Sequence, residues 1–209
     1  NISRNRAYPD FKNDSKFNNL TENTMEILFK ANSFPNTLNT LMGIESNYLL
    51  RIGDATIPNN QLQVATSVNN CTSADLQLES GKWYHVAVAF NKGNVKVYIN
   101  GVEKLSGSTG KSSVSLGAKH TNEEDGSRCF WVGYSYKDDR YFDGVVSEVR
   151  IWNRALTAEE IQATNHFYTI EPESEGLIAY WKFDEGSGTV AKDYSVRSEE
   201  RTSELQSHY

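Results

Sequence analysis

The sequence contains no cluster of lysine and arginine, no long apolar run and only two cysteines. Lysine and arginine number 21 against 27 aspartate and glutamate, a formal net charge of −6. A nucleic-acid partner is therefore not expected, because phosphate neutralisation needs clustered positive charge. No segment approaches the roughly 18 apolar residues of a membrane-spanning helix, which argues against membrane insertion. The chain also begins without Met and a charged-then-apolar leader, so we expect a mature form or an excised fragment.

The two cysteines, Cys71 and Cys129, are too few for a disulfide scaffold. Whether they pair depends on a Cα geometry that the sequence leaves open. They cannot form a zinc site alone, and the four histidines show no ligand spacing with them. No cofactor is required by any motif in the chain.

Aromatic residues and short apolar runs are the positive features of the sequence. Phe, Trp and Tyr make up 11% of an otherwise ordinary globular composition with 38% hydrophobic residues. The apolar runs alternate with polar residues and are separated by Asn, Gly, Asp and Ser, which predicts an antiparallel all-β fold. The first runs are residues 25–29, 48–52 and 62–64.

Residues 83–105 give the clearest pattern, a meander of three strands. Tyr84, Val86, Val88 and Phe90 share one face of the first strand, and His85 lies on the other, either packed or partly exposed. Residues 95–99 alternate in the same way. The dipeptide Asn100-Gly101 that follows favours a two-residue hairpin, because both positions accept a positive φ.

In the second half of the sequence the pattern of apolar residues is less regular. Strands are expected at residues 114–116, 130–136, 145–152 and 177–183. A helix is expected from Thr157, which forms a capping box with Glu160, to about Asn165. The polar tail 196–209 lacks apolar periodicity, so we expect it to be disordered or non-native, after a single domain that spans residues 1–195.

These segments resemble the laminin-G-like domains of the concanavalin A-like lectin/glucanase superfamily. The resemblance covers residues 8–165 and is carried by residues 8–11, 17–21, 83–90, 97–102 and 140–157. It implies an antiparallel jelly-roll β-sandwich with one short α-helix. The phrase at residues 176–188 resembles the start of such a jelly roll, and is either a closing strand of the same sandwich or a truncated next repeat. We favour the closing strand, because an exposed Trp181 and Phe183 would form a large apolar patch.

The resemblance implies a non-catalytic, lectin-like carbohydrate-binding module of a secreted or cell-surface, bacterial multidomain protein. The location would be extracellular, at the cell surface or periplasmic, and the partner a glycan. Two alternatives stay open, because the same fold also hosts protein-binding adhesion modules and glycoside hydrolases. A hydrolase needs paired carboxyl groups. The acids here lie in Gly-flanked loops at residues 123–125, 138–139 and 184–185, where solvated loop charge is the better interpretation, so no catalytic residue is assigned.

Two candidate sites lie near residue 140. An aromatic side chain can carry the apolar face of a sugar ring, while planar polar groups bind its hydroxyls. The expected ligand-binding residues are Trp131, Tyr134, Tyr136, Arg140 and Tyr141, whereas Trp83 and Trp152 are expected in the core. Asp138 and Asp139 are candidate ligands for Ca²⁺, because related pentraxin-type domains carry acidic metal ligands in this loop and calcium prefers hard oxygen atoms.

Overall fold

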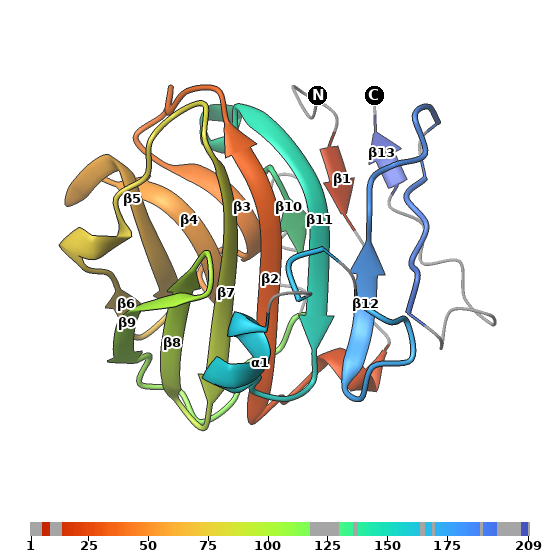
Figure 1. The fold of residues 1–209 in the computed structure, drawn as a ribbon. Helices are drawn as coiled ribbons and strands as arrows, with labels where there is room; N and C mark the ends of the chain where they lie inside the picture. Colours follow the sequence, from red (N-terminus) through yellow and green to blue (C-terminus); the bar gives the residue numbers. More distant parts are fainter. Residues whose placement is uncertain are drawn as a thin grey trace.

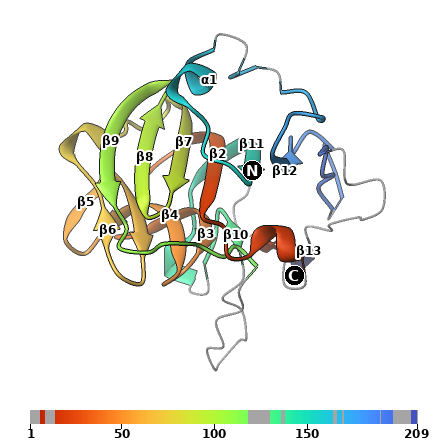
Figure 2. The ribbon, with the colours of Figure 1, turned by 90° about the horizontal axis from the view of Figure 1, so that it is seen from below.

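The chain folds into two antiparallel β-sheets packed face to face, with one short helix outside them (Figures 1 and 2). This computed structural model describes residues 6–8, 14–117, 130–135, 138–163, 166–168, 170–188, 190–195 and 206–208. Two sheets, each with one apolar face, bury those faces against each other, so the arrangement confirms the expected jelly-roll sandwich. Within the described residues, no helix has the length and apolar character needed to cross a bilayer.

The first sheet has seven strands. In spatial order they are β13 (Gln206–His208), β1 (Arg6–Tyr8), β10 (Trp131–Val132), β3 (Asn39–Ile44), β4 (Tyr48–Asp54), β5 (Ile57–Thr66) and β6 (Asn70–Cys71). The second sheet has six strands. In spatial order they are β12 (Leu177–Trp181), β11 (Gly144–Trp152), β2 (Glu22–Ala31), β7 (Trp83–Asn91), β8 (Asn94–Ile99) and β9 (Val102–Ser108). β2 therefore lies between strands that come much later in the chain.

The main core lies between the two sheets and contains the face predicted for β7. Val86, Val88 and Phe90 are fully buried there, and Tyr84 packs against them. The predicted meander is confirmed as β7, β8 and β9. Its second turn has positive φ at both Asn100 and Gly101, 50° and 79°, as a two-residue hairpin of this type requires.

The helix α1 (Ala158–Gln162) is shorter than the expected 157–165 but starts as predicted. The Thr157 hydroxyl accepts the backbone N–H of Glu160, and the Glu160 carboxylate accepts the backbone N–H of Thr157. This capping box satisfies two amide donors that the first turn leaves free. Ile161 is fully buried and fixes the helix on the six-stranded sheet.

The last apolar run forms the edge strand β12, which pairs with β11 in the six-stranded sheet. Trp181 is fully buried in the main core and Phe183 packs against it, so this strand closes the same sandwich. The domain boundary at residue 195 stays a prediction. Gln206–His208 of the tail pair with β1, and the expectation that residues 196–209 are disordered or non-native also stays a prediction. Backbone pairing does not need the apolar periodicity on which that expectation depended.

Two strand predictions need correction, and the strand β3 was not predicted. Residues 114–116 form a single bridge, between Val114 and Leu20, and residues 130–136 supply only the two-residue strand β10. The strand β3 was missed, because its sequence Asn-Thr-Leu-Met-Gly-Ile has no regular alternation and its ladder contains a bulge after Thr40. Cys71 is a buried free thiol, while Cys129 lies outside the described residues.

Candidate functional site

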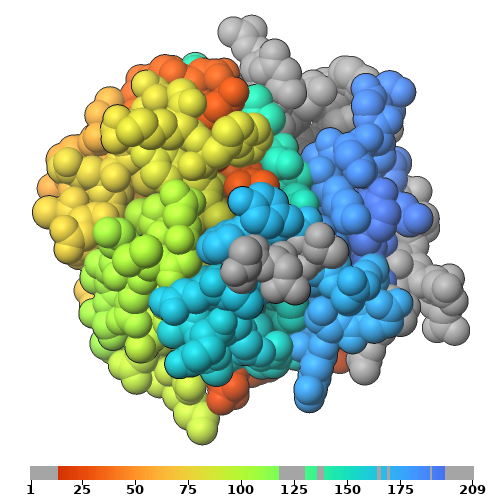
Figure 3. Space-filling view, viewed as in Figure 1, coloured from red at the N-terminus to blue at the C-terminus, as the bar shows by residue number. Residues whose placement is uncertain are grey.

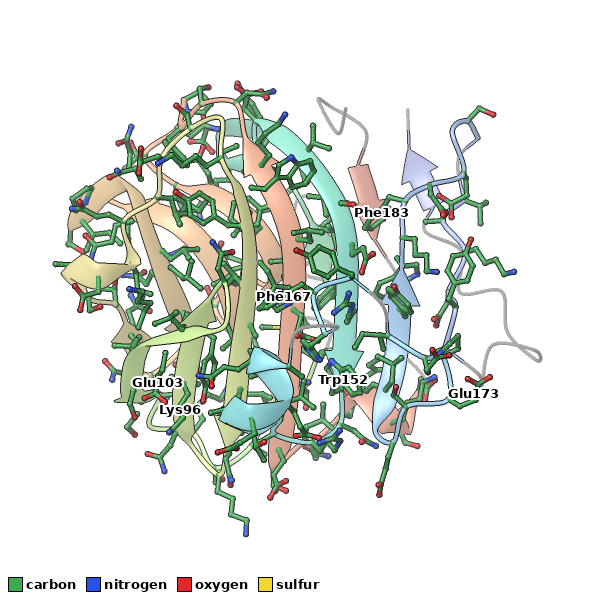
Figure 4. All side chains as sticks on the ribbon, in the orientation of Figure 1. Lys96, Glu103, Trp152, Phe167, Glu173 and Phe183 are labelled. Atoms are coloured by element: carbon green, nitrogen blue, oxygen red, sulfur yellow. The ribbon has the colours of Figure 1, made fainter. Side chains whose placement is uncertain are left out.

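The six-stranded sheet has a second, outer face, which α1 and the chain after it cover in part (Figures 1 and 2). A second apolar cluster forms where they meet. It contains Ala87, Ala89, Tyr98, Trp152, Leu156, Ile161, Leu177 and Tyr180. Trp152 is therefore buried, as predicted, but on the outer face and not between the sheets. Figure 4 shows Trp152 and Phe167 on this face beside α1.

A fully buried carboxylate lies on the outer face, in the middle of the sheet. Glu26 of β2 accepts a hydrogen bond from the indole Nε1 of Trp152, at 2.6 Å from its Oε2. Its other oxygen, Oε1, lies 2.6 Å from Nε2 of His166 and 3.1 Å from Nε2 of His85. We call Glu26, His85, Trp152 and His166 the Glu26 cluster. At most 7% of the surface of any of these four side chains is exposed.

The hydrogen-bond donors of the cluster keep Glu26 ionised in spite of its burial. Burial alone would raise the pKa of this carboxyl, because a charge loses its hydration. The close contact with His166 and charge interactions with both His85 and His166 outweigh burial and hold the pKa of Glu26 well below its ordinary value of 4.5. A buried negative charge of this kind is stable only with its partners in place.

His166 attaches the turn 166–168 to the sheet through both its ring and its backbone carbonyl. The ring of His166 contacts Glu26, as described above, and stacks on Trp152 with an angle of 24° between the rings. The backbone carbonyl of His166 accepts a hydrogen bond from Nη1 of Arg150, at 2.7 Å. Arg150 is itself held by the carboxylate of Glu148. The turn is therefore fixed on the outer face by charged side chains of β2 and β11.

A pocket of about 470 Å³ opens beside this turn. It is lined by Leu28, Trp83, His85, Asn100, Ser147, Phe167 and Tyr168. Trp83 and Tyr168 are the exposed aromatic side chains of the lining, with 46% and 79% of their surface accessible. In Figure 3 a small orange-red area of β2 is visible between the yellow segment that leads into β7 and the teal and blue segments of the second half of the chain.

Local features of the backbone place the polar groups of this pocket. Ser147 lies at a bulge in β11, between the paired residues Val146 and Glu148, and a bulge of this kind changes the direction of a side chain. The side-chain oxygen of Asn100 accepts the backbone N–H of His85 at 2.9 Å, which fixes its amide at the hairpin turn. Nζ of Lys30 lies 5.5 Å from the ring of Trp83 and steadies the indole by a cation–π contact.

Gly101 joins the hairpin turn to the wall of the pocket. Its φ of 79° favours glycine, and a Cβ atom there would meet Cζ of Phe167 at 3.0 Å. Phe167 in turn packs edge-on against the ring of His85, with ring centroids 4.9 Å apart. The turn after β8 and the turn after α1 are therefore packed directly against each other.

The structure separates the residues that the sequence predicts to bind ligand. Trp131 and Tyr134 pack edge-on against each other, 5.2 Å apart, with 5% and 7% of their surface exposed, so they offer little area to a sugar. Arg140 forms an ion pair with Glu45 at 3.0 Å. Tyr141 is partly exposed, and Tyr136 lies outside the described residues. Ligand binding by this group stays a prediction.

The expected calcium ligands lie in a short 3₁₀ turn, Asp138–Arg140. Asp139 is exposed, and the side chain of Asp138 is not among those described. Among the described residues, Asp139 belongs to no group of three or more acidic, histidine or cysteine side chains that could share an ion. Calcium prefers six to eight oxygen ligands, so a site here would depend on backbone carbonyls and water. It also stays a prediction.

Sequence reasoning placed Trp83 in the core, which is wrong. The signal that could have found it is the alternation of β7: Trp83 has the parity of His85 and not of Val86, so it belongs to the outer face. The contribution of Tyr168 had no comparable signal. Its position in the pocket depends on how the turn after α1 packs against the sheet, and a local sequence pattern cannot predict such a long-range contact.

The chain is similar to a known protein family and to solved structures. A family model described as the concanavalin A-like lectin/glucanases superfamily matches residues 5–162. An inferred carbohydrate-binding protein from Bacteroides ovatus has a similar structure, with a TM-score of 0.75 and 29% identity over 91% of this chain. This chain spans 53% of that protein, about half of its length. No curated protein sequence matches with significance.

More distant structures share the fold alone. Domain 4 of the extracellular arabinanase AbnA from Geobacillus stearothermophilus, solved with arabinotriose, has a TM-score of 0.54 and 24% identity. The match covers 75% of this chain and 69% of that domain. A heptameric SAP-like pentraxin from Limulus polyphemus has a TM-score of 0.54 and 16% identity, over 91% of this chain and 93% of the pentraxin. With the family model matching most of its length, the chain belongs to the concanavalin A-like lectin/glucanase superfamily.

Proposed function

We propose that the chain is a non-catalytic carbohydrate-binding module of a secreted or cell-surface bacterial protein, and that the pocket between Trp83 and Tyr168 holds the sugar. The observation that carries this proposal is the pocket itself, with two exposed aromatic side chains, Trp83 on the six-stranded sheet and Tyr168 on the turn after α1. Its volume of about 470 Å³ lies within the usual range for small-molecule sites.

The chemistry of the lining favours a neutral sugar. Trp83 and Tyr168 present apolar ring faces for the C–H face of a pyranose or furanose ring. Asn100 and Ser147 supply an amide and a hydroxyl for sugar hydroxyl groups. None of the seven lining residues is an aspartate, glutamate, lysine or arginine, so nothing in the lining would pair with an acidic sugar.

Superfamily membership and the Bacteroides ovatus protein support carbohydrate binding at a coarse level. The non-catalytic assignment is supported by the seven described lining residues, among which there is no carboxylate. A retaining or inverting glycosidase needs two carboxyl groups across the scissile bond. A second depression, of about 500 Å³, has exposed Glu173 and Glu175 in its wall and is the place where a glycosidase alternative would be tested. An adhesion module that binds protein is the other alternative.

The test is a glycan array followed by calorimetric titration of the best ligand, with four proteins. The wild type is compared with Trp83→Ala, Tyr168→Ala and Tyr141→Ala, the last of which alters the rim near residue 140 and leaves the pocket intact. We expect each pocket variant to weaken binding by about 10-fold or more, because a stacked aromatic contributes on the order of 1.5 kcal/mol. Tyr141→Ala should bind as the wild type does.

Other outcomes separate the alternatives. Loss of binding in Tyr141→Ala alone, with a calcium dependence revealed by EGTA, would move the site to the rim and to Asp138 and Asp139. If the protein binds no glycan on a broad array, the result would contradict sugar binding and favour the protein-binding alternative. Release of reducing sugar from a bound glycan, abolished by Glu173→Gln or Glu175→Gln, would overturn the non-catalytic assignment.

A further inference from the structure

The Glu26 cluster has a geometry that sugar binding does not explain. Three atoms that can bind a metal ion converge there: Oε1 of Glu26, Nε2 of His85 and Nε2 of His166. All three lie within 4.8 Å of one another. They come from β2, from β7 and from the turn after α1, so only the folded chain brings them together.

The ring of His85 has unused hydrogen-bonding capacity inside this cluster. Both of its nitrogen atoms are buried, and within the described part of the chain neither makes a hydrogen bond. Nε2 lies 3.1 Å from Oε1 of Glu26, but the direction of the contact is not that of a hydrogen bond. A buried polar atom without a partner is costly, and native structures rarely keep one without a reason. A metal ion would use the lone pair of Nε2.

The donor atoms fit a small transition-metal ion. Zinc binds imidazole nitrogen at about 2.0–2.1 Å and carboxylate oxygen at about 2.0–2.2 Å in a tetrahedron, which places neighbouring donor atoms about 3.3 Å apart. The separation of 3.1 Å between Glu26 and His85 is close to this value, and the 2.6 Å between Glu26 and His166 would need to open by a few tenths of an ångström. Calcium and magnesium are disfavoured, because both prefer oxygen ligands.

The surroundings of the carboxylate also suit a metal ligand. Trp152 donates to Oε2, the oxygen that does not face the histidines, and so fixes the orientation of the carboxylate. Supporting donors of this kind hold metal ligands in place, and their loss typically weakens metal binding 10–100-fold. Arg150, the cation opposite Glu26 on β11, is engaged by Glu148 and by the carbonyl of His166.

We propose that Glu26, His85 and His166 bind one zinc ion, with the fourth position left to water. His85 also lines the pocket, so the ion would lie beside the proposed sugar site and would attach the turn that carries Phe167 and Tyr168 to the sheet. This inference does not depend on sugar binding. It describes a site separate from the calcium site expected at Asp138 and Asp139.

The experiment uses the full chain, stripped with a chelator and exchanged into metal-free buffer. Zinc is titrated by calorimetry, with calcium and magnesium as comparison ions, and cobalt is added separately to record its visible absorption. We expect one zinc ion per chain with a micromolar or lower Kd, no calcium or magnesium binding at this site, and the intense absorption of tetrahedral cobalt. Because zinc binds the folded chain, it should also raise the Tm.

Variants then assign the ligands. His85→Gln and His166→Asn should each weaken zinc binding about 100-fold or more, and Trp152→Phe, which keeps all three ligands, about 10-fold. Tyr168→Ala changes the pocket but no ligand and should bind zinc normally. Circular dichroism identifies any variant that does not fold, and the cobalt spectrum of the wild type tests the proposal without variants. Absence of tetrahedral cobalt absorption, or equal zinc binding in wild type, His85→Gln and His166→Asn, would overturn it.

Discussion

Nε2 of His166 lies 2.6 Å from Oε1 of Glu26, a residue 140 positions earlier in the chain. This contact joins the turn after α1 to the central part of the six-stranded sheet. Without it, the His166 ring would lose the polar contact that holds it between Trp152 and His85. The turn that carries Phe167 and Tyr168 would keep the hydrogen bond from Arg150 to the His166 carbonyl and the packing of Phe167 on His85. Five predictions test this and related features.

Glu26→Gln should lower the free energy of unfolding by about 2–4 kcal/mol at neutral pH. The substitution removes a buried charge that accepts from Trp152 and contacts two histidines, and leaves those donors poorly matched. Urea unfolding of both proteins in the presence of a chelator measures the difference without a contribution from bound metal. A loss below 0.5 kcal/mol would contradict the role assigned to the carboxylate.

The same pair of proteins gives a pH prediction. The pKa of Glu26 is lowered in the folded chain, so its contribution to stability is complete above the unfolded value of about 4.5 and is lost as the pH falls towards the folded pKa. The stability gap between wild type and Glu26→Gln should therefore be wider at pH 5.5 than at pH 3.5. The other carboxyl groups are common to both proteins and cancel in the comparison. If the stability gap is instead wider at pH 3.5, folding does not lower the pKa of Glu26, which contradicts the prediction.

Gly101→Ala should destabilise the chain more than Gly81→Ala. Both glycines have a φ of 79°, so both substitutions carry a backbone strain of about 1–2 kcal/mol. Only at position 101 does the new methyl group meet Phe167, whereas nothing lies within 4 Å of a Cβ at position 81. The difference between the two losses, measured by urea unfolding, isolates the contact between the hairpin turn and the pocket wall. Equal losses would mean that Phe167 moves away at no cost.

Thr157→Ala should cost about 1 kcal/mol, since it removes the side-chain acceptor for the Glu160 N–H at the start of α1. Thr157→Ser keeps the hydroxyl group and is the matched control, with a loss of no more than a few tenths of a kcal/mol. If both substitutions cost the same, the methyl group of Thr157 and not the cap would be responsible.

Cys71 should react slowly with a thiol reagent while the chain is folded. Burial raises the pKa of this thiol, and its Sγ donates to the carbonyl of Ser108 at 3.3 Å. In a Cys129→Ser background at pH 8, we expect labelling about 100-fold slower than in urea, because the thiolate is the reactive form and the side chain is covered. Rapid labelling of the folded chain would mean that β6 opens easily.

The sequence predicts a strand well where apolar and polar residues alternate regularly within that strand. β7 and β8 alternate regularly, and Asn100-Gly101 specifies their connection to β9 within two residues. β3 could not be predicted in the same way. Its side chains are buried on both faces, so alternation between buried and exposed positions is missing.

The candidate site was harder to predict, because its residues meet only through strand register. Leu28 pairs with His85 and Glu26 pairs with Arg150, and neither register can be read from one strand alone. The spacing of the cysteines and histidines gave no indication of a shared site. It could not show that a glutamate and two histidines from three separate segments converge. The mutual packing of Trp131 and Tyr134, which leaves little of either ring exposed, is likewise not visible in the sequence pattern.

The position of β2 in its sheet has a consequence for synthesis. β2 is complete by residue 31, yet its neighbours in the sheet, β7 and β11, end at residues 91 and 152. A chain growing on a ribosome therefore carries β2 with one unpaired edge until β11 has emerged. Apolar strands with free edges are the segments that associate with other chains or need a chaperone. Any truncation before Gly144 should yield an aggregation-prone product, however well the meander of β7, β8 and β9 forms.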